Sequence, residues 1–172
     1  MNFKVLSENK IILLLVPGIT YNQSILKFSR TLSNRYVCYV TLNKSFSALV
    51  ESFKYKRVKA DKFFFIDCVT KTVISPAREK NVSFIKSPSA LTDLSLAIKK
   101  QLPKSDIIVI DSLSTLLIYH EPDRVANFIH NIINKVQLNK KTILIVLMSK
   151  SDSDNTLFKK VEVMVNKVVK LT

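Results

Sequence analysis

Glycine is nearly absent from this chain of 172 residues, in which Gly18 is the only one. Dinucleotide sites of the Gly-x-Gly-x-x-Gly type need several glycines, because these residues let the backbone approach the phosphates closely. The serine-hydrolase motif Gly-x-Ser-x-Gly also needs more than one. A single glycine therefore excludes both kinds of site.

Cysteine and histidine are almost as scarce, with two of each. Cys38 and Cys68 are too few for a disulfide framework, and neither they nor His120 and His130 have the spacing of metal ligands. We expect reduced thiols and no metal site. His130 should lie on the polar side of a helix, with His120 in the loop before that helix.

Long hydrophobic runs are missing too. No run is longer than that from Ile11 to Val16, which is far shorter than the roughly 20 residues that span a bilayer. The amino terminus carries Glu8 and no long apolar core, so we expect no signal peptide, no membrane contact and a cytoplasmic location. Acidic residues number 13 against 27 basic ones, which gives a net charge of +14. Such a charge suits a polyanionic partner, but it also serves plain solubility.

What the chain does contain is an alternation of short apolar runs and amphipathic stretches, with no repeats or linkers. This predicts one domain over residues 1–172. Because strands that alternate with helices favour right-handed crossovers, we expect an α/β fold: a three-layer α/β/α sandwich around a mostly parallel sheet. The expected strands are 11–16, 36–42, 63–67, 81–86, 107–111, 142–148 and 168–169. The expected helices are 23–34, 46–57, one between Ser87 and Pro103, 122–138, and a last one capped by Asp154.

The run 107–111 is apolar until it ends in Asp111, which Ser112 follows. An acid at the carboxyl end of a buried strand is the Walker B pattern, in which the carboxylate holds a magnesium ion on a nucleotide. Alternatively, Asp111 caps the following loop or helix, or makes a polar contact at the edge of the sheet. Asp67 ends another buried strand, and the two acids could together bind a cation, although we favour ordinary loop capping for both.

In this order, the segments resemble the RecA-like P-loop ATPase superfamily, and within it the KaiC-like branch. The pattern is most similar to small archaeal KaiC-like proteins of unknown function, and it extends from about Lys10 to Leu171. The resemblance implies a RecA-like three-layer fold. It is carried by Val40-Thr-Leu-Asn-Lys-Ser45, Phe65-Ile-Asp-Cys-Val-Thr-Lys71, Ser87-Pro-Ser-Ala-Leu-Thr-Asp-Leu94, Asp111-Ser-Leu-Ser-Thr-Leu-Leu117 and the stretch 128–135.

The segment that should bind phosphate departs from this family. A P-loop reads Gly-x-x-x-x-Gly-Lys-[Ser/Thr], whereas positions 17–24 read Pro-Gly-Ile-Thr-Tyr-Asn-Gln-Ser. Ser24 keeps the hydroxyl on the magnesium side. Pro17 and Asn22 replace the two glycines, and Gln23 replaces the lysine. Proline offers no N–H to a phosphate, and glutamine carries no positive charge, so this is a degenerate Walker A motif.

A second departure concerns the glutamate pair that ends the second strand in KaiC-like ATPases, where one glutamate activates the attacking water. The matching residues here are Asn43 and Lys44. Neither an amide nor an ammonium group can act as a general base at neutral pH. We therefore expect no catalytic residues.

The resemblance and its departures together favour a non-catalytic KaiC/RecA-like domain. It would act as a protein-interaction or regulatory module without ATP hydrolysis, with no cofactor, through a protein partner or self-association. The alternative is an ATP-binding switch or weak ATPase that takes ATP and magnesium. That site would comprise Gly18, Asn22, Gln23, Ser24, Asp111 and Ser112.

A third hypothesis is a nucleic-acid-binding module. Five cations lie within nine residues, with Tyr55 among them and only Asp61 opposing them. Clustered cations neutralise phosphates, and a tyrosine can stack on a base. The competing interpretation, which we favour, is a solvated helix end whose cations complement the helix dipole. The five residues are Lys54, Lys56, Arg57, Lys59 and Lys62.

The position of Tyr21 distinguishes two hypotheses for the loop 17–24: a phosphate site that has decayed, and one that has been remodelled. In a decayed loop it would be exposed and mobile. In a remodelled loop, Pro17 fixes φ and Gly18 permits a tight turn, and Tyr21 folds back over the carboxyl edge of the sheet. Its side chain would then fill the space that a nucleotide would occupy, with its hydroxyl near Asp111 or Asn43. We favour the remodelled loop.

Overall fold

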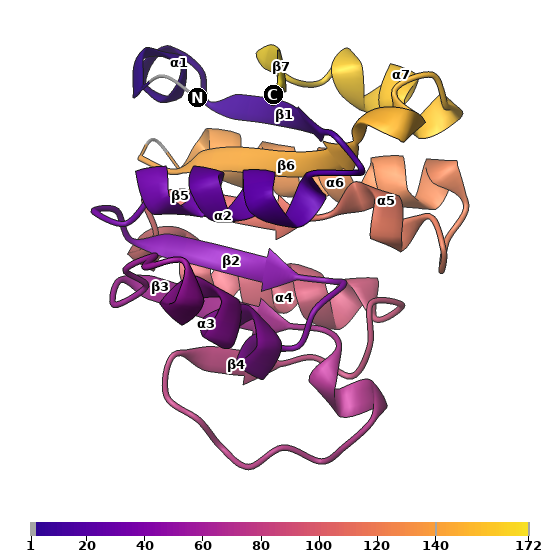
Figure 1. Cartoon of the computed structure of the whole chain (residues 1–172). Helices are drawn as coiled ribbons and strands as arrows, with labels where there is room; N and C mark the ends of the chain where they lie inside the picture. Colours follow the sequence, from indigo (N-terminus) through magenta and orange to yellow (C-terminus); the bar gives the residue numbers. More distant parts are fainter. Residues whose placement is uncertain (1–2, 140, 172) are drawn as a thin grey trace.

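The computed structural model describes residues 3–139 and 141–171. Within these residues, seven strands form one sheet in which every neighbouring pair is parallel (Figure 1). The spatial order is β4-β3-β2-β5-β6-β1-β7. The strands are β1 Ile11–Val16, β2 Val37–Thr41, β3 Phe63–Asp67, β4 Val82–Phe84, β5 Ile107–Asp111, β6 Ile143–Ser149 and β7 Lys167–Lys170.

Helices cover both faces of this sheet, which confirms the predicted three-layer α/β/α architecture (Figure 1). One face carries α1 Phe3–Glu8, α2 Tyr21–Thr31 and α3 Phe46–Tyr55. The other carries α4 Leu91–Gln101, α5 Leu113–Leu116, α6 Pro122–Leu138 and α7 Thr156–Glu162. Three short 3-10 turns complete the described elements: η1 Thr70–Thr72, η2 Leu102–Lys104 and η3 Lys150–Asp152.

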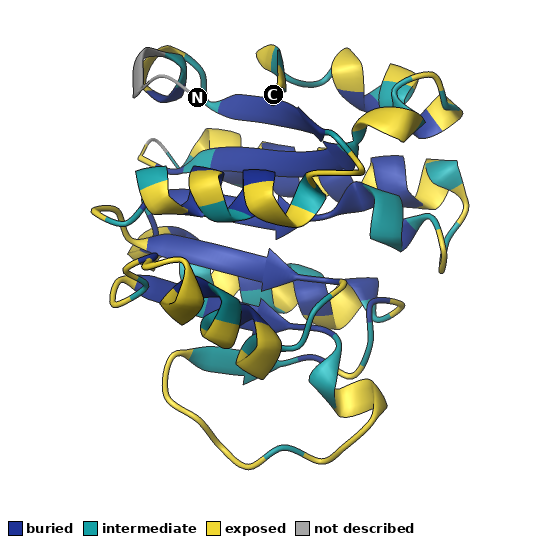
Figure 2. Ribbon diagram, in the orientation of Figure 1, coloured by how far each residue is buried: buried dark blue, intermediate teal, exposed yellow. Residues whose placement is uncertain are grey.

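The central strands are apolar at nearly every position, which suits a sheet whose two faces are both covered. Every residue of β1 is buried: Ile11 and Leu13 contact the core under α4–α7, whereas Ile12 and Leu14 contact the core under α1–α3. Figure 2 shows this burial continuing through the middle of the sheet. The alternation follows from the two-residue period of a strand, which sends successive side chains to opposite faces.

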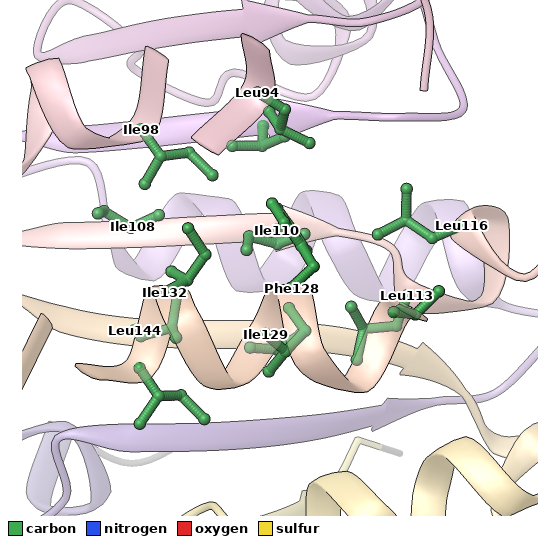
Figure 3. Close-up of a cluster of buried hydrophobic side chains, with 14 of the residues drawn as sticks. Leu94, Ile98, Ile108, Ile110, Leu113, Leu116, Phe128, Ile129, Ile132 and Leu144 are labelled. Carbon is green, nitrogen blue, oxygen red and sulfur yellow. The ribbon is translucent and has the colours of Figure 1, made fainter. Parts of the chain in front are cut away.

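The longest helix, α6, has the bounds that its apolar stripe predicts. Pro122 occupies its first turn, where a missing N–H breaks no helical hydrogen bond. Its buried side chains gather against β5 and β6, and Figure 3 shows Ile129 and Ile132 close to Ile110 and Leu144. Fully burying each such side chain contributes about 1.5–3 kcal/mol, so α6 anchors its face of the sheet.

The predicted starts of α4 and α7 are wrong. The helix expected from Ser87 begins only at Leu91, because Ser87 instead makes a turn in which its hydroxyl accepts from the Ser89 N–H at 3.2 Å. The last helix is capped not by Asp154 but by Asn155, whose Oδ1 accepts from the Phe158 N–H at 2.8 Å. The short helices α1 and α5 were not predicted.

The parallel strands bring their carboxyl ends to one edge of the sheet, at the right of Figure 1. Helix α2 returns from the end of β1 and α3 from the end of β2, so both helices begin at this carboxyl edge and end at the amino edge. Thr41 at the end of β2 pairs with Asp67 on one side and Asp111 on the other. No helix in the described part of the chain is long and apolar enough to cross a membrane.

Candidate functional site

Asp111 lies at the centre of the carboxyl edge, and only 3% of its surface is exposed. The Tyr21 hydroxyl, on the first residue of α2, donates to Asp111 Oδ1 at 2.5 Å. The Tyr39 hydroxyl, on the neighbouring strand β2, donates to Oδ2 at 2.6 Å. The Asn43 amide also donates to Oδ1, at 3.3 Å. Both carboxylate oxygens therefore already have partners.

The predicted fold-back of Tyr21 over the carboxyl edge agrees with this geometry, since its hydroxyl contacts the predicted partner Asp111. Tyr21 is half-buried rather than exposed. Of the two structural roles expected for Asp111, a cap or a polar contact at the sheet edge, the structure shows the polar contact: its carboxylate accepts from the side chains of Tyr21, Tyr39 and Asn43. Ser112, at the N-cap position of α5, makes no side-chain cap and pairs with the Thr115 hydroxyl at 3.2 Å. The peptide bond between Asp111 and Ser112 is cis.

Burial raises the pKa of the Asp111 carboxyl above its usual range, although hydrogen bonds from Tyr21, Tyr39 and Asn43 and the charge of Lys44 act in the opposite direction. Burial also raises the pKa of both tyrosines, and the negative charge of Asp111 adds to that rise. A hydrogen bond from Ser112 opposes the rise at Tyr21. Both phenols therefore stay protonated and remain donors to Asp111.

The raised pKa of Asp111 predicts a specific pH dependence of stability. Just above the usual aspartate pKa, the folded state holds a proton on Asp111 that the unfolded chain has released, so the free energy of unfolding falls as pH rises. The fall ends once pH passes the folded-state pKa. Asp111→Asn removes the titration, so its unfolding free energy relative to wild type should increase over this window. Urea unfolding measured at a series of pH values checks this, and a constant difference would contradict it.

The predicted phosphate segment, 17–24, forms a short loop followed by a helix that begins early. Helix α2 starts at Tyr21, two residues before the predicted start, so only four residues, 17–20, connect it to β1. The Tyr21 N–H donates to the Gly18 carbonyl at 3.3 Å and the Ser24 N–H to the Thr20 carbonyl at 2.8 Å. Two N–H groups of this segment are thus occupied within it.

Gly18 does not serve the turn in the predicted way. Its φ is not positive, and a Cβ placed on it would meet nothing within 4 Å. The chain therefore turns from β1 into α2 without using the conformational freedom of glycine. The turn contains Pro17 and is short because α2 begins early. Ser24 is buried, and its hydroxyl pairs with that of Thr20 at 3.2 Å.

The structure brings together only part of the predicted nucleotide site. Tyr21, Asn22, Asn43, Lys44 and Asp111 surround a space of about 10 Å³, roughly the room that one water molecule needs. Gln23, in the lysine position, is exposed and instead lines a groove on the outer side of α2. The predicted site is therefore split, and its inner part is filled.

Asp67 caps a loop, as favoured from the sequence. Its carboxylate accepts from the N–H groups of Phe46 at 2.7 Å, Val69 at 2.6 Å and Thr70 at 2.8 Å, and also from the Thr70 hydroxyl. Asp67 is fully buried and is separated from Asp111 by the whole of β2. The two acids do not form a pair, and no cluster of metal-ligand side chains occurs among the described residues.

Tyr39 is the site residue that the sequence did not reveal. It lies inside β2, where it pairs with Val109, two positions before Asp111 on β5. A tyrosine in an otherwise apolar strand carries a hydroxyl that needs a partner when it is buried. That signal, combined with the neighbouring acid at the end of β5, could have identified it.

The remaining sequence candidates lie away from Asp111. Lys54, Lys56, Arg57, Lys59 and Lys62 are all exposed at the end of α3 and in the segment after it. His130 is exposed on α6, as predicted. His120 lies in the loop before α6, where its Nε2 is buried and has no hydrogen-bond partner among the described residues.

Comparison with known proteins identifies the family and agrees with the observed fold. The family model described as "ATPase: KaiC" matches residues 30–172. KaiC-like protein PH0186 from the archaeon Pyrococcus horikoshii superposes with a TM-score of 0.61 at 14% sequence identity, covering 95% of this chain and 72% of its own. The flagellar accessory protein FlaH from Methanocaldococcus jannaschii superposes with a TM-score of 0.63 at 14% identity, covering 94% and 70% respectively. None of the curated protein sequences matches significantly.

Proposed function

Because the chain belongs to the KaiC ATPase family and has its RecA-like fold, we propose that it is a KaiC-like domain that no longer hydrolyses ATP. It acts instead by binding a protein partner or a second copy of itself. The observation that carries this proposal is the hydrogen bond of 2.5 Å between Tyr21 and Asp111.

The Tyr21–Asp111 contact opposes nucleotide binding in a direct physical way. A Walker B carboxylate acts by holding the magnesium ion that bridges the β- and γ-phosphates. Here both oxygens of Asp111 accept from phenols. The remaining space of about 10 Å³ takes at most roughly one water molecule, so a magnesium ion with phosphate ligands requires Tyr21 to leave.

The groups that would perform hydrolysis are also replaced. Asn43 stands where the family has a glutamate, and its amide donates to Asp111 rather than accepting a proton from water. The Lys44 backbone is held in a turn by the Thr41 hydroxyl, which donates to the Lys44 carbonyl at 2.6 Å. Neither side chain is a general base at neutral pH. This supports a structural role for these two residues.

Apolar side chains exposed at the carboxyl edge support a protein partner. Ile19 in the loop after β1 is fully exposed, and Ile118 and Tyr119 in the segment after α5 are 77% and 48% exposed. Ile118, Tyr119 and His120 line a cavity of about 580 Å³ beside the start of α7. Exposed apolar and aromatic side chains beside a cavity, such as Ile118 and Tyr119, are a feature of protein-contact surfaces.

Phosphate release in the presence of magnesium and ATP or GTP tests the loss of hydrolysis. We expect no release above buffer from the wild-type protein, because the lysine and the glutamate pair are missing and Asp111 is occupied. Asp111→Ala serves as the background control. Release by the wild type that disappears in Asp111→Ala would contradict the proposal, since only a working site depends on that carboxylate.

A nucleotide-dependent switch is the second candidate, and the half-burial of Tyr21 favours it. A side chain at the start of a helix can move aside if a ligand contributes enough binding energy. A ligand that binds only the folded state raises the melting temperature. Protection of the wild type by ATP and magnesium, without phosphate release, would therefore replace the first proposal with this one.

A further inference from the structure

The outer surface of α2 and α3 gathers positive charge from two separate parts of the chain. Arg30 of α2 donates a hydrogen bond to the backbone carbonyl of Lys56, just beyond the end of α3. Lys27 and Arg30 thereby join the cations that follow α3, although 26 residues separate Arg30 from Lys56. We name this surface the α2–α3 patch; it comprises Lys27, Arg30, Lys54, Lys56, Arg57, Lys59 and Lys62.

The charge of the α2–α3 patch is not neutralised within the protein. All seven side chains belong to exposed residues, and none forms an ion pair with a carboxylate in the part of the chain that the structure describes. Glu51 and Asp61 are the acids that lie among these residues in sequence. Seven cations against two acids create a local positive potential that attracts polyanions.

The patch also has a defined shape. Lys27, Arg30 and Lys56 line a groove of about 230 Å³ between α2 and the end of α3, together with Gln23 and Leu26. Arg30 is held against the Lys56 carbonyl, and Lys62 Nζ donates to the Asn34 carbonyl at 3.4 Å. Cations fixed in this way lose less conformational entropy when they bind a phosphate than freely moving side chains do.

Two exposed tyrosines flank the cations. Tyr55 is 80% exposed and Tyr36 is 56% exposed. Lys56 Nζ lies 4.8 Å from the centre of the Tyr55 ring, and Lys62 Nζ lies 5.2 Å from the centre of the Tyr36 ring. An exposed aromatic ring beside a cation offers a base a stacking face and its phosphate a charge, which is the pattern of single-strand binding surfaces.

The end of α3 has a backbone conformation that is unfavourable for its residue. Arg57 has a φ of 54°, in the left-handed region, and it follows the helix in a Schellman motif: its N–H donates to the Lys54 carbonyl at 3.0 Å, and the Val58 N–H donates to the Phe53 carbonyl at 2.8 Å. Glycine is the preferred residue at this position. An arginine in the left-handed conformation is less stable than a glycine would be. Residues with such unfavourable backbone conformations are more common at functional sites.

From these observations we propose that the α2–α3 patch binds single-stranded nucleic acid, with its cations on the phosphates and Tyr36 and Tyr55 stacked on bases. The groove lies on the outer side of α2 and does not include Asp111. The proposal is therefore independent of whether the carboxyl edge binds ATP.

Fluorescence anisotropy of a labelled single-stranded oligonucleotide tests the charges. We expect wild-type binding at low salt that weakens steeply as salt rises. Lys27→Gln/Arg30→Gln/Lys56→Gln should reduce affinity by at least about tenfold at low salt and lower the log–log salt slope by about 2, because three phosphate contacts are lost. The matched control removes the same charge from the opposite helix layer, with Lys99→Gln/Lys100→Gln/Lys104→Gln, and should lose far less affinity.

Two single substitutions keep the test valid if the triple variant folds poorly. Arg57→Gly relieves the left-handed arginine, so it should fold at least as stably as the wild type and still bind more weakly. Tyr55→Ala should reduce affinity about fivefold or more through lost stacking, with the salt slope unchanged. If Tyr55 only supported the structure of the patch, its removal would change the salt slope together with the affinity.

Several outcomes would overturn the proposal. These are no binding at low salt, equal losses in the patch and control variants, and tighter binding of a duplex than of the single strand. Displacement of the oligonucleotide by poly-glutamate at equal charge would also overturn it, since the patch would then recognise acidic protein. Retained binding in the presence of ATP at constant ionic strength is the expected result, because the patch is separate from the carboxyl edge.

Discussion

Replacing Tyr21 with alanine is expected to lower the melting temperature by about 5–10 °C. The substitution removes the half-buried ring from its packing against the core under α1–α3, and it removes one of the two phenols that donate to Asp111. The buried carboxylate then keeps Tyr39 and Asn43 as partners. Thermal unfolding followed by circular dichroism measures the change.

Two variants show which part of Tyr21 is responsible. Tyr21→Phe keeps the ring and removes only the donor, so it should lose roughly half as much stability as the alanine variant. Gly18→Ala is the matched control in the same loop, because a Cβ at Gly18 meets nothing within 4 Å, and it should leave the melting temperature unchanged. If Tyr21→Ala also melts at the wild-type temperature, the loop is not held shut by this residue.

Asp67→Ala should destabilise the fold even more. Asp67 is fully buried and satisfies three backbone N–H groups, those of Phe46, Val69 and Thr70. Leaving buried donors unpaired costs about 1–3 kcal/mol each, so we expect a total loss of about 3–5 kcal/mol after some rehydration. For a chain of this size, this corresponds to a melting temperature lower by roughly 6–20 °C.

The matched control for Asp67 is Asp154→Ala, at an exposed acid that caps no helix, and it should have no measurable effect. Asp67→Asn keeps one acceptor oxygen and should fall between the two. Normal stability of Asp67→Ala, combined with any loss of ligand binding, would show that Asp67 is a functional acid instead of a loop cap.

The architecture could be predicted because it depends on patterns that are local in sequence. The structure has the predicted bounds for the buried strand Ile107–Asp111 and for the long amphipathic helix Pro122–Leu138. The helices Phe3–Glu8 and Leu113–Leu116 are too short for a periodic apolar pattern to identify. The start of α4 was misplaced because serine hydroxyls cap turns as readily as helices.

The site was only partly predictable because it joins residues from different strands and helices. Tyr21 could be placed near Asp111, since the loop after the first strand must cross the end of the sheet. Tyr39 was missed because nothing local distinguishes a tyrosine that packs from one that donates to a neighbouring strand. Lys27 and Arg30 were missed for the same reason: only the fold brings α2 beside the end of α3.

Calorimetric titration of magnesium–ATP into the wild-type protein and into Tyr21→Ala tests the central claim most directly, because it measures whether the carboxyl edge can accept a nucleotide at all. We predict no binding to the wild type at ATP concentrations up to about 1 mM, since Tyr21 and Tyr39 occupy both oxygens of Asp111. Weak binding to Tyr21→Ala alone would agree with a crevice that this side chain closes. Binding to the wild type with a dissociation constant in the micromolar range would contradict the account.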